Sequence, residues 1–309
     1  MAGAVGEFEA QRGRLFGLAY RLLGSAADAE DVVQDAYLRW HGADPAAIGA
    51  PGPWLAKVVT NLAMNRLTSA RAQRERYTGP WLPEPVLTAD GTLGPLETAQ
   101  QRELVSLGLL VLLERLTPAE RAVFVLREAF GYPHREIAQI LDLSEPNCRQ
   151  LHRRGSQRLG TPLARFRADR GQWRRLTERF LAAAANGDVA GLERLLAEDA
   201  GYTGDGQGSG LPVARKPVTG RPRVARFFAR VVPRYAADPR FAGVELSVAE
   251  VNGQPTVLAW SAETLLAVLL LEADGAAIAA LWLVANPGKL AFAARQAAGA
   301  PRAEGLPRG

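Results

Sequence analysis

Apolar residues recur every three or four positions in the first part of the chain, which predicts amphipathic helices. One such stripe runs from Phe8 to Leu23, and Ser25 before a cluster of acidic residues indicates the start of a second helix. Trp54 opens a third helix after a stretch rich in Gly and Pro. Residues 1–76 are therefore predicted to form an all-helical module.

A second helical module, residues 100–170, ends in three short helices with a tight turn before the last one. Thr117 and Pro118 suit the N-cap and first turn of a helix, and Gly131 lies in the break that ends it. Ser144 can cap a final helix that is rich in arginine. This order of elements is typical of a helix-turn-helix, which lays its last helix in the DNA major groove.

The polar surface of that final helix carries side chains that can contact base edges. Arginine forks to guanine or pairs with phosphate, whereas Asn and Gln can pair with adenine. The candidate duplex-binding residues are Asn147, Arg149, Gln150, Arg153 and Arg154. The alternative is an ordinary surface helix with solvated charges.

The pattern changes in the last part of the chain, where helices are followed by runs of alternating apolar residues. Asn-Gly and Asp-Gly pairs separate those runs between residues 241 and 284, as hairpin turns do. Residues 172–296 are therefore predicted to be an α+β domain with a curved antiparallel sheet. Residues 77–99, rich in Pro and Gly, are predicted to be a semi-extended linker, and residues 297–309 a disordered tail.

Composition narrows the protein class. A single cysteine, Cys148, excludes an intramolecular disulfide and, on an apolar helix face, is expected to be a buried hydrophobe. No apolar run has the length of a membrane span and no signal peptide is recognisable, so a cytoplasmic location is expected. The three histidines lack companions at metal-ligand spacing, so neither a metal nor a cofactor is predicted.

Charge is distributed in blocks. Seven arginines occur in residues 145–170 and four in residues 66–76, whereas residues 26–35 hold four acidic residues and no basic one. Two basic patches and one acidic patch favour two nucleic-acid contacts and one contact with a basic protein surface. Solvated helix faces would produce similar blocks.

Three stretches, in order and spacing, resemble a sigma-70-type initiation factor of the extracytoplasmic-function class: GRLFGLAYRLLGSAADAEDVVQDAYLRW, PWLAKVVTNLAMNRL and the helix-turn-helix. The first two resemble region 2, which binds core RNA polymerase and melts the promoter −10 element. The third resembles region 4, which reads the −35 element. Residues 172–296 resemble the SnoaL-like, ketosteroid-isomerase-like cone domain that one subgroup of these factors carries. Two short strings also resemble the sequence pattern of that subgroup: WLPEPV in the linker and NPGKL at 286–290.

The resemblance assigns roles to individual residues of region 2. The −10 element would be bound by Trp54, Lys57, Asn61, Asn65 and Arg66. The first four share one helical face by their spacing, and such side chains suit unstacked bases. Trp54 could instead anchor the core. The polymerase clamp would contact Asp28, Asp31 and Asp35.

The resemblance also places a regulatory loop in the C-terminal domain, at Asp205, Asn286 and Lys289. The subgroup pattern there is imperfect, because Gln207 interrupts the glycines and Gly288 stands where an aspartate is usual. The domain is expected to pack against the linker and regulate rather than catalyse. A small apolar ligand in its cone is a candidate partner.

We therefore expect a sigma factor that binds core RNA polymerase and promoter DNA and directs promoter-specific initiation, modulated by its C-terminal domain. The expected fold is multidomain, with two all-α modules and an α+β cone. One alternative is a ligand-responsive helix-turn-helix regulator, which leaves residues 20–76 unexplained. Another is an isomerase-like enzyme with a DNA-binding appendage, which leaves most of the chain unexplained.

Overall fold

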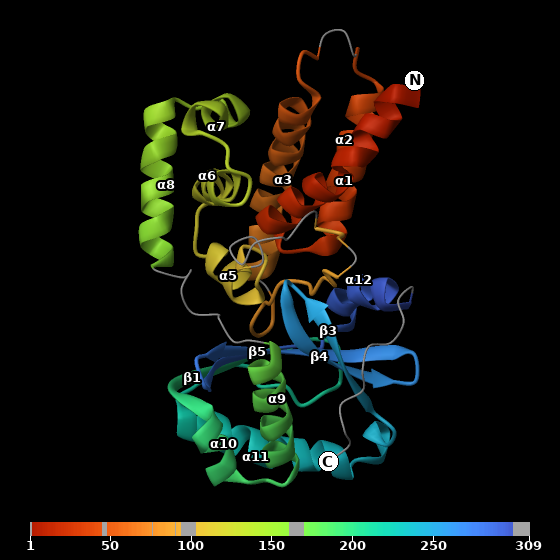
Figure 1. Ribbon diagram of the computed structural model, residues 1–309, viewed down its shortest axis with the longest axis vertical. Coiled ribbons are helices and arrows are strands. Elements are labelled where there is room, and N and C mark those ends of the chain that lie inside the picture. The colour runs from red at the N-terminus through yellow and green to blue at the C-terminus, as the bar shows by residue number, and fades with distance from the viewer. Residues whose placement is uncertain are drawn as a thin grey trace. The chain divides into compact units, whose positions relative to one another are not determined.

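The computed structural model describes residues 2–44, 48–75, 77–89, 91–93, 103–160 and 170–298, except for the side chains of 2–4, 70–75 and 170. The chain divides into two compact units (Figure 1). The first unit comprises residues 1–76 and 88–162, and the second comprises residues 77–87 and 163–309. Among the described helices, none combines the length and apolar character that crossing a bilayer requires.

The first unit begins with three long helices, α1 (Ala2–Leu23), α2 (Ala26–His41) and α3 (Pro51–Glu75). The apolar stripes of the sequence face inward, with Leu22, Val32 and Leu55 fully buried where the helices meet. Ser25 caps α2, since its hydroxyl accepts a hydrogen bond from the Asp28 amide at 3.1 Å. All three helices confirm the predicted elements.

Shorter helices follow among the described residues: α5 (Leu107–Leu113), α6 (Pro118–Glu128), α7 (His134–Leu141) and α8 (Glu145–Leu159). Thr117 and Glu120 form a reciprocal capping box at the start of α6. Asp142 ends α7 in a left-handed conformation with φ 53°, and Ser144 caps α8. The helix-turn-helix prediction is confirmed in its order and its caps.

The two predicted helical modules lie in one compact unit, because α6 and α7 pack against α1 and α3 (Figure 1). Arg121 of α6 is 1% exposed and its Nε donates to the Arg21 carbonyl at 3.1 Å, while Nη1 contacts Glu114 at 2.5 Å. Burial lowers the pKa of the neighbouring Arg21 to about 10, which still leaves that side chain charged at neutral pH. Removing a partner of such a buried guanidinium group would leave its charge uncompensated, which destabilises a fold.

The second unit is an α+β domain. Its strands are β1 (Leu196–Asp205), β2 (Val218–Thr219), β3 (Glu245–Val251), β4 (Gln254–Ser261), β5 (Thr264–Asp274) and β6 (Ala277–Val284). They form one sheet in the order β2-β1-β6-β5-β4-β3. Its helices are α9 (Arg170–Ala185), α10 (Val189–Leu195), α11 (Arg221–Ala237) and α12 (Pro287–Ala298). Phe180 and Tyr202 each pack edge-to-face against Phe228 within the core, where α9, α10 and α11 meet the sheet.

Several sequence predictions for this unit need correction. The sheet is mixed, because β1 pairs with β6 in parallel. Strand β1 lies outside the predicted runs at 241–284, and it includes Gly201 and Gly204 before it ends at Asp205. The strand predicted from Phe241 begins at Glu245, after a 3-10 turn at Pro239–Phe241. Helix α12 was not anticipated, and the predicted tail beyond Ala298 lies outside the described residues.

Part of the predicted linker, residues 77–99, is extended and contacts the C-terminal domain. Residues 77–87 belong to the second unit, where Leu87 forms a β-bridge with Val251. Val86 and Asn252 exchange two hydrogen bonds, from the Val86 amide to the Asn252 side chain (3.1 Å) and from the Asn252 amide to the Val86 carbonyl (2.9 Å). The extended, proline-containing stretch therefore has fixed partners along its length.

Candidate functional site

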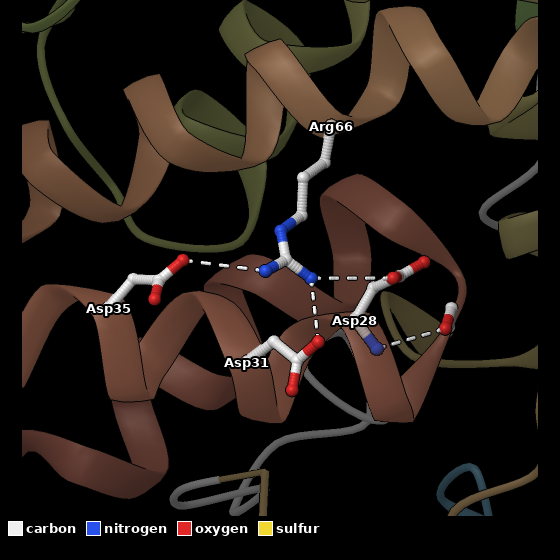
Figure 2. Close-up of polar contacts among 5 residues, drawn as sticks. Asp28, Asp31, Asp35 and Arg66 are labelled. Atoms are coloured by element: carbon white, nitrogen blue, oxygen red, sulfur yellow. Dashed lines mark hydrogen bonds and ion pairs between the residues drawn. The ribbon is translucent and has the colours of Figure 1, made fainter.

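An ion-pair cluster joins α3 to α2. Figure 2 shows Arg66 extending from α3 toward three carboxylates that occur every three or four residues on α2. The Arg66 Nη1 lies 2.9 Å from Asp31 and 3.5 Å from Asp28, and its Nη2 lies 3.4 Å from Asp35. The residues predicted to bind polymerase and one residue predicted to bind the −10 element are thus in direct contact.

One guanidinium faces three carboxylates, so the cluster keeps an excess of negative charge. Partial burial lowers the pKa of Arg66, but the hydrogen bond and charge of Asp31, with Asp28 and Asp35, outweigh it and the pKa is raised. The four side chains are 32–62% exposed, so each pair is worth only ~0–1 kcal/mol. The main effect of Arg66 is to hold three exposed carboxylates together.

The other predicted −10 residues follow a different face of α3. At about 100° per residue, Arg66 points about 120° away from Trp54 on the helix. Trp54 is half-buried against Trp40, with ring centroids 5.8 Å apart, which supports a partial anchoring role. Asn61 is half-buried and Asn65 is exposed. Trp54, Lys57, Asn61 and Asn65 therefore share one face of α3, whereas Arg66 lies on another face, turned toward α2.

Lys57, on that same face of α3, contacts the helix-turn-helix. Its ammonium lies 2.7 Å from the Asp142 carboxylate and donates to the Gln139 carbonyl at 2.9 Å. Asp142 is the left-handed residue that ends α7. A cation predicted to contact the −10 element is thus engaged by the turn of the duplex-binding module, within the same unit.

Helix α8 presents its predicted contacts to solvent. The side chains are exposed at every candidate position, Asn147, Arg149, Gln150, Arg153 and Arg154. Arg149 forms an ion pair with Glu145 one turn earlier. Cys148 is buried on the opposite side, where burial raises the pKa of its thiol, so the prediction of a buried hydrophobe is confirmed.

His152 lies half-buried on the side of α8 that contacts α6. Its Nε2 is 2.9 Å from a Glu128 carboxylate oxygen, and its ring lies 5.3 Å from the ring of His134. Burial, then the charges of His152, Arg127 and Arg149, lower the pKa of His134. Within the described ranges, no group of three His, Cys, Asp or Glu side chains is arranged to hold a metal ion.

The second unit brings Asp205, Asn286 and Lys289 together around the segment 77–87. One Asp205 carboxylate oxygen accepts from the Tyr77 hydroxyl at 2.5 Å, and the other accepts from the Leu82 amide at 3.0 Å and from the Lys289 ammonium at 2.5 Å. Asn286 donates to the Tyr77 oxygen at 2.7 Å. The predicted regulatory residues therefore bind the linker directly.

Sequence reasoning missed the partners on the linker side. The Lys289 ammonium donates to the Leu82 carbonyl at 2.5 Å and lies over the Tyr77 and Trp81 rings, at 4.7 and 4.2 Å from their centroids. Burial and the Asp205 hydrogen bond raise the pKa of Tyr77, so its hydroxyl stays protonated as a donor. The sequence feature that could have indicated these partners is the pair of aromatic residues at 77 and 81, four positions apart.

Comparisons with known proteins match both parts of the first unit. Residues 8–73 match the family described as Sigma-70 region 2, and residues 106–159 match Sigma-70, region 4. The chain is 38% identical over 294 residues to the ECF RNA polymerase sigma factor SigJ of Mycobacterium tuberculosis, with 92% of each chain covered. It is 31% identical over 290 residues to the probable sigma factor SigI of the same species, covering 92% of this chain and 93% of SigI.

This chain belongs to the extracytoplasmic-function (ECF) sigma factors. The crystal structure of SigJ from M. tuberculosis is similar with a TM-score of 0.72 at 35% identity, covering 93% of this chain and 98% of SigJ. That coverage extends the likeness through the C-terminal α+β domain. The predicted ECF fold is confirmed, and these relatives favour neither a ligand-responsive regulator nor an isomerase-like enzyme.

Proposed function

We propose that this ECF sigma factor binds core RNA polymerase and directs it to a class of promoters in the cytoplasm. The observation that supports this most is the match of both sigma regions, in order, in a chain that aligns with SigJ over nearly its whole length. The function is that of an initiation factor without catalytic residues of its own.

The acidic cluster of α2 is the proposed contact with polymerase. Asp28, Asp31 and Asp35 are exposed on one side of the helix, and Arg66 holds them together without neutralising them. A basic surface on the clamp would complement the remaining negative charge. Arg66 then serves as a positioning residue for this contact. The contact with the −10 element is proposed for the face of α3 that carries Trp54, Lys57, Asn61 and Asn65.

The two DNA contacts are proposed on α8 and α3. Exposed arginines and amides on α8 suit the edges and phosphates of a −35 duplex. Trp54, Lys57, Asn61 and Asn65 suit unstacked −10 bases. Because Lys57 is held by Asp142, this face becomes fully available only when that ion pair opens. Polymerase binding would supply the free energy for that opening.

The C-terminal domain is proposed to modulate output through residues 77–87. This segment joins α3 to α5 in the sequence, and the buried Asp205–Lys289 pair holds it. Loosening that pair would free the tether between the two promoter-contacting parts. A small apolar ligand remains a prediction, and its entry would require rings such as Phe180 and Phe228, 5.0 Å apart in the core, to move.

Run-off transcription with reconstituted core polymerase tests the proposal. Full-length protein should initiate at defined sites, and a chain ending before α9 should initiate with altered output. Asp31→Asn should weaken polymerase capture without changing promoter-duplex binding, whereas Arg153→Gln should do the reverse. Glu178→Gln in α9 provides a matched loss of one exposed carboxylate from an ion pair. Failure of the full-length chain to bind core polymerase at low salt would reject the proposed function.

A further inference from the structure

The net positive charge of the protein is concentrated in its C-terminal part. Residues 1–162 contain 18 Lys and Arg and 18 Asp and Glu, whereas residues 163–309 contain 19 and 14. Helix α11, RPRVARFFARVVPRYAA, carries five arginines and no acidic residue. An excess equal to the whole net charge of +5 therefore lies on one helix of the domain that neither sigma region covers.

Four of these arginines form one stripe along α11. Arg223, Arg226, Arg230 and Arg234 follow at intervals of three and four residues, so they share a face about 16 Å long. All four are exposed, and none forms an ion pair or hydrogen bond with any residue that the structure describes. Some other exposed arginines of this domain have partners, among them Arg240, which lies 2.7 Å from Asp238.

The stripe borders a hollow of about 580 Å³. Arg223, Arg226 and Arg230 line it together with Val218 of β2 and with Phe227 and Val231 of α11. The Phe227 ring stacks on Tyr202, with centroids 4.8 Å apart, and Phe228 beside it lies in the core. These contacts fix the helix, so the arginines project from a rigid surface with an apolar floor.

We propose that this α11 face binds the sugar–phosphate backbone of duplex DNA, independently of base sequence. Unpaired guanidinium groups are the preferred protein ligands of phosphate oxygens. Phosphates of one strand follow every ~3.4 Å along the duplex axis, so a stripe of this length reaches several of them. The apolar floor accepts deoxyribose between them. This contact is additional to those of α3 and α8, and it does not depend on polymerase.

The test measures binding of the full-length chain to a duplex without promoter sequence over a range of salt concentrations. The stripe variant is Arg223→Gln/Arg226→Gln/Arg230→Gln. The matched control is Arg174→Gln/Arg194→Gln/Arg240→Gln, which removes the same charge from ion-paired positions of the same domain. The slope of log affinity against log salt should fall by about 0.9 for each lost phosphate contact, and so by about 2–3 in the stripe variant.

The control should keep the wild-type slope. An equal fall in both variants would reduce the effect to bulk charge and overturn the proposal, as would an unchanged slope in the stripe variant or no duplex binding by the wild type. Arg230→Gln alone provides a second measurement with a smaller perturbation, and it should lower the slope by about 0.9. Because no polymerase is present, these outcomes are separate from success or failure of transcription initiation.

Discussion

Removal of the Asp205 carboxylate should release residues 77–87 from the C-terminal domain. Asp205→Ala deletes the acceptor of three hydrogen bonds, from Tyr77, Leu82 and Lys289. The Asp205 side chain is fully buried and that of Lys289 is 9% exposed, so the substitution leaves an ammonium group without its counter-ion in a poorly solvated place. Both the stability of the domain and the attachment of the segment should suffer.

The expected cost follows from that burial. Removing one partner of a buried ion pair destabilises a protein by ~3–5 kcal/mol. In a domain of this size each kcal/mol lowers the Tm by about 2–4 °C, so a fall of about 10 °C is expected. Asp205→Asn/Lys289→Met removes both charges and keeps the volume, so it should recover most of the loss.

Thermal unfolding of the wild type, Asp205→Asn, Lys289→Met and the double variant gives the coupling energy between the two side chains. Hydrogen exchange at the Leu82 amide reports the attachment itself, since that amide donates to Asp205. Exchange at this amide should be faster in Asp205→Ala than in the wild type. The double variant should restore slow exchange only in part. Additive effects on Tm, or an unchanged Leu82 exchange rate, would refute the reasoning.

Three further predictions concern the first unit. Arg66→Ala should weaken capture of core polymerase by about 1 kcal/mol, because Arg66 no longer holds the three carboxylates in one orientation. Binding to a −35 duplex should stay unchanged, and an equal loss in both assays would contradict the prediction. Asp142→Asn should increase the affinity for a single-stranded −10 oligonucleotide several-fold by freeing Lys57, and Lys57→Met should cancel that gain; no gain would leave Lys57 outside the −10 contact. Arg149→Ala should reduce discrimination between cognate and altered −35 bases by about 1–3 kcal/mol, as measured by competition binding, and an unchanged preference would limit Arg149 to phosphate contacts.

Local signals in the sequence predicted the helical elements well. Thr117, Pro118 and Ser144 marked helix starts that the structure reproduces, since capping depends only on neighbouring residues. Hairpin pairs likewise marked the turn between β3 and β4. The parallel pairing of β1 with β6 could not be predicted in this way, because the paired residues, such as Gly201 and Ala280, are 79 positions apart in the chain and the glycines of β1 are more typical of a loop.

In the candidate site too, features set by neighbouring residues could be predicted, whereas contacts between distant residues could not. The exposure of the α8 arginines followed from helical periodicity. Two features of the sequence favour the contact of Arg66 with the acidic cluster: Asp28, Asp31 and Asp35 form a stripe of like charge that attracts a cation, and Arg66 does not share the face of Trp54. The partners of the linker could not, because Leu87 and Gln296 are separated by 209 positions in the chain.

The bridge between Leu87 and Val251 also covers part of one edge of the sheet. Strand β3 is an edge strand of the sheet, and an edge strand has unpaired amide and carbonyl groups that can pair with a strand of another molecule. Residues 86 and 87 occupy one end of this strand through the bridge and the paired bonds with Asn252. A fragment that begins at residue 88 would leave that end uncovered, and it should self-associate more readily than the intact chain.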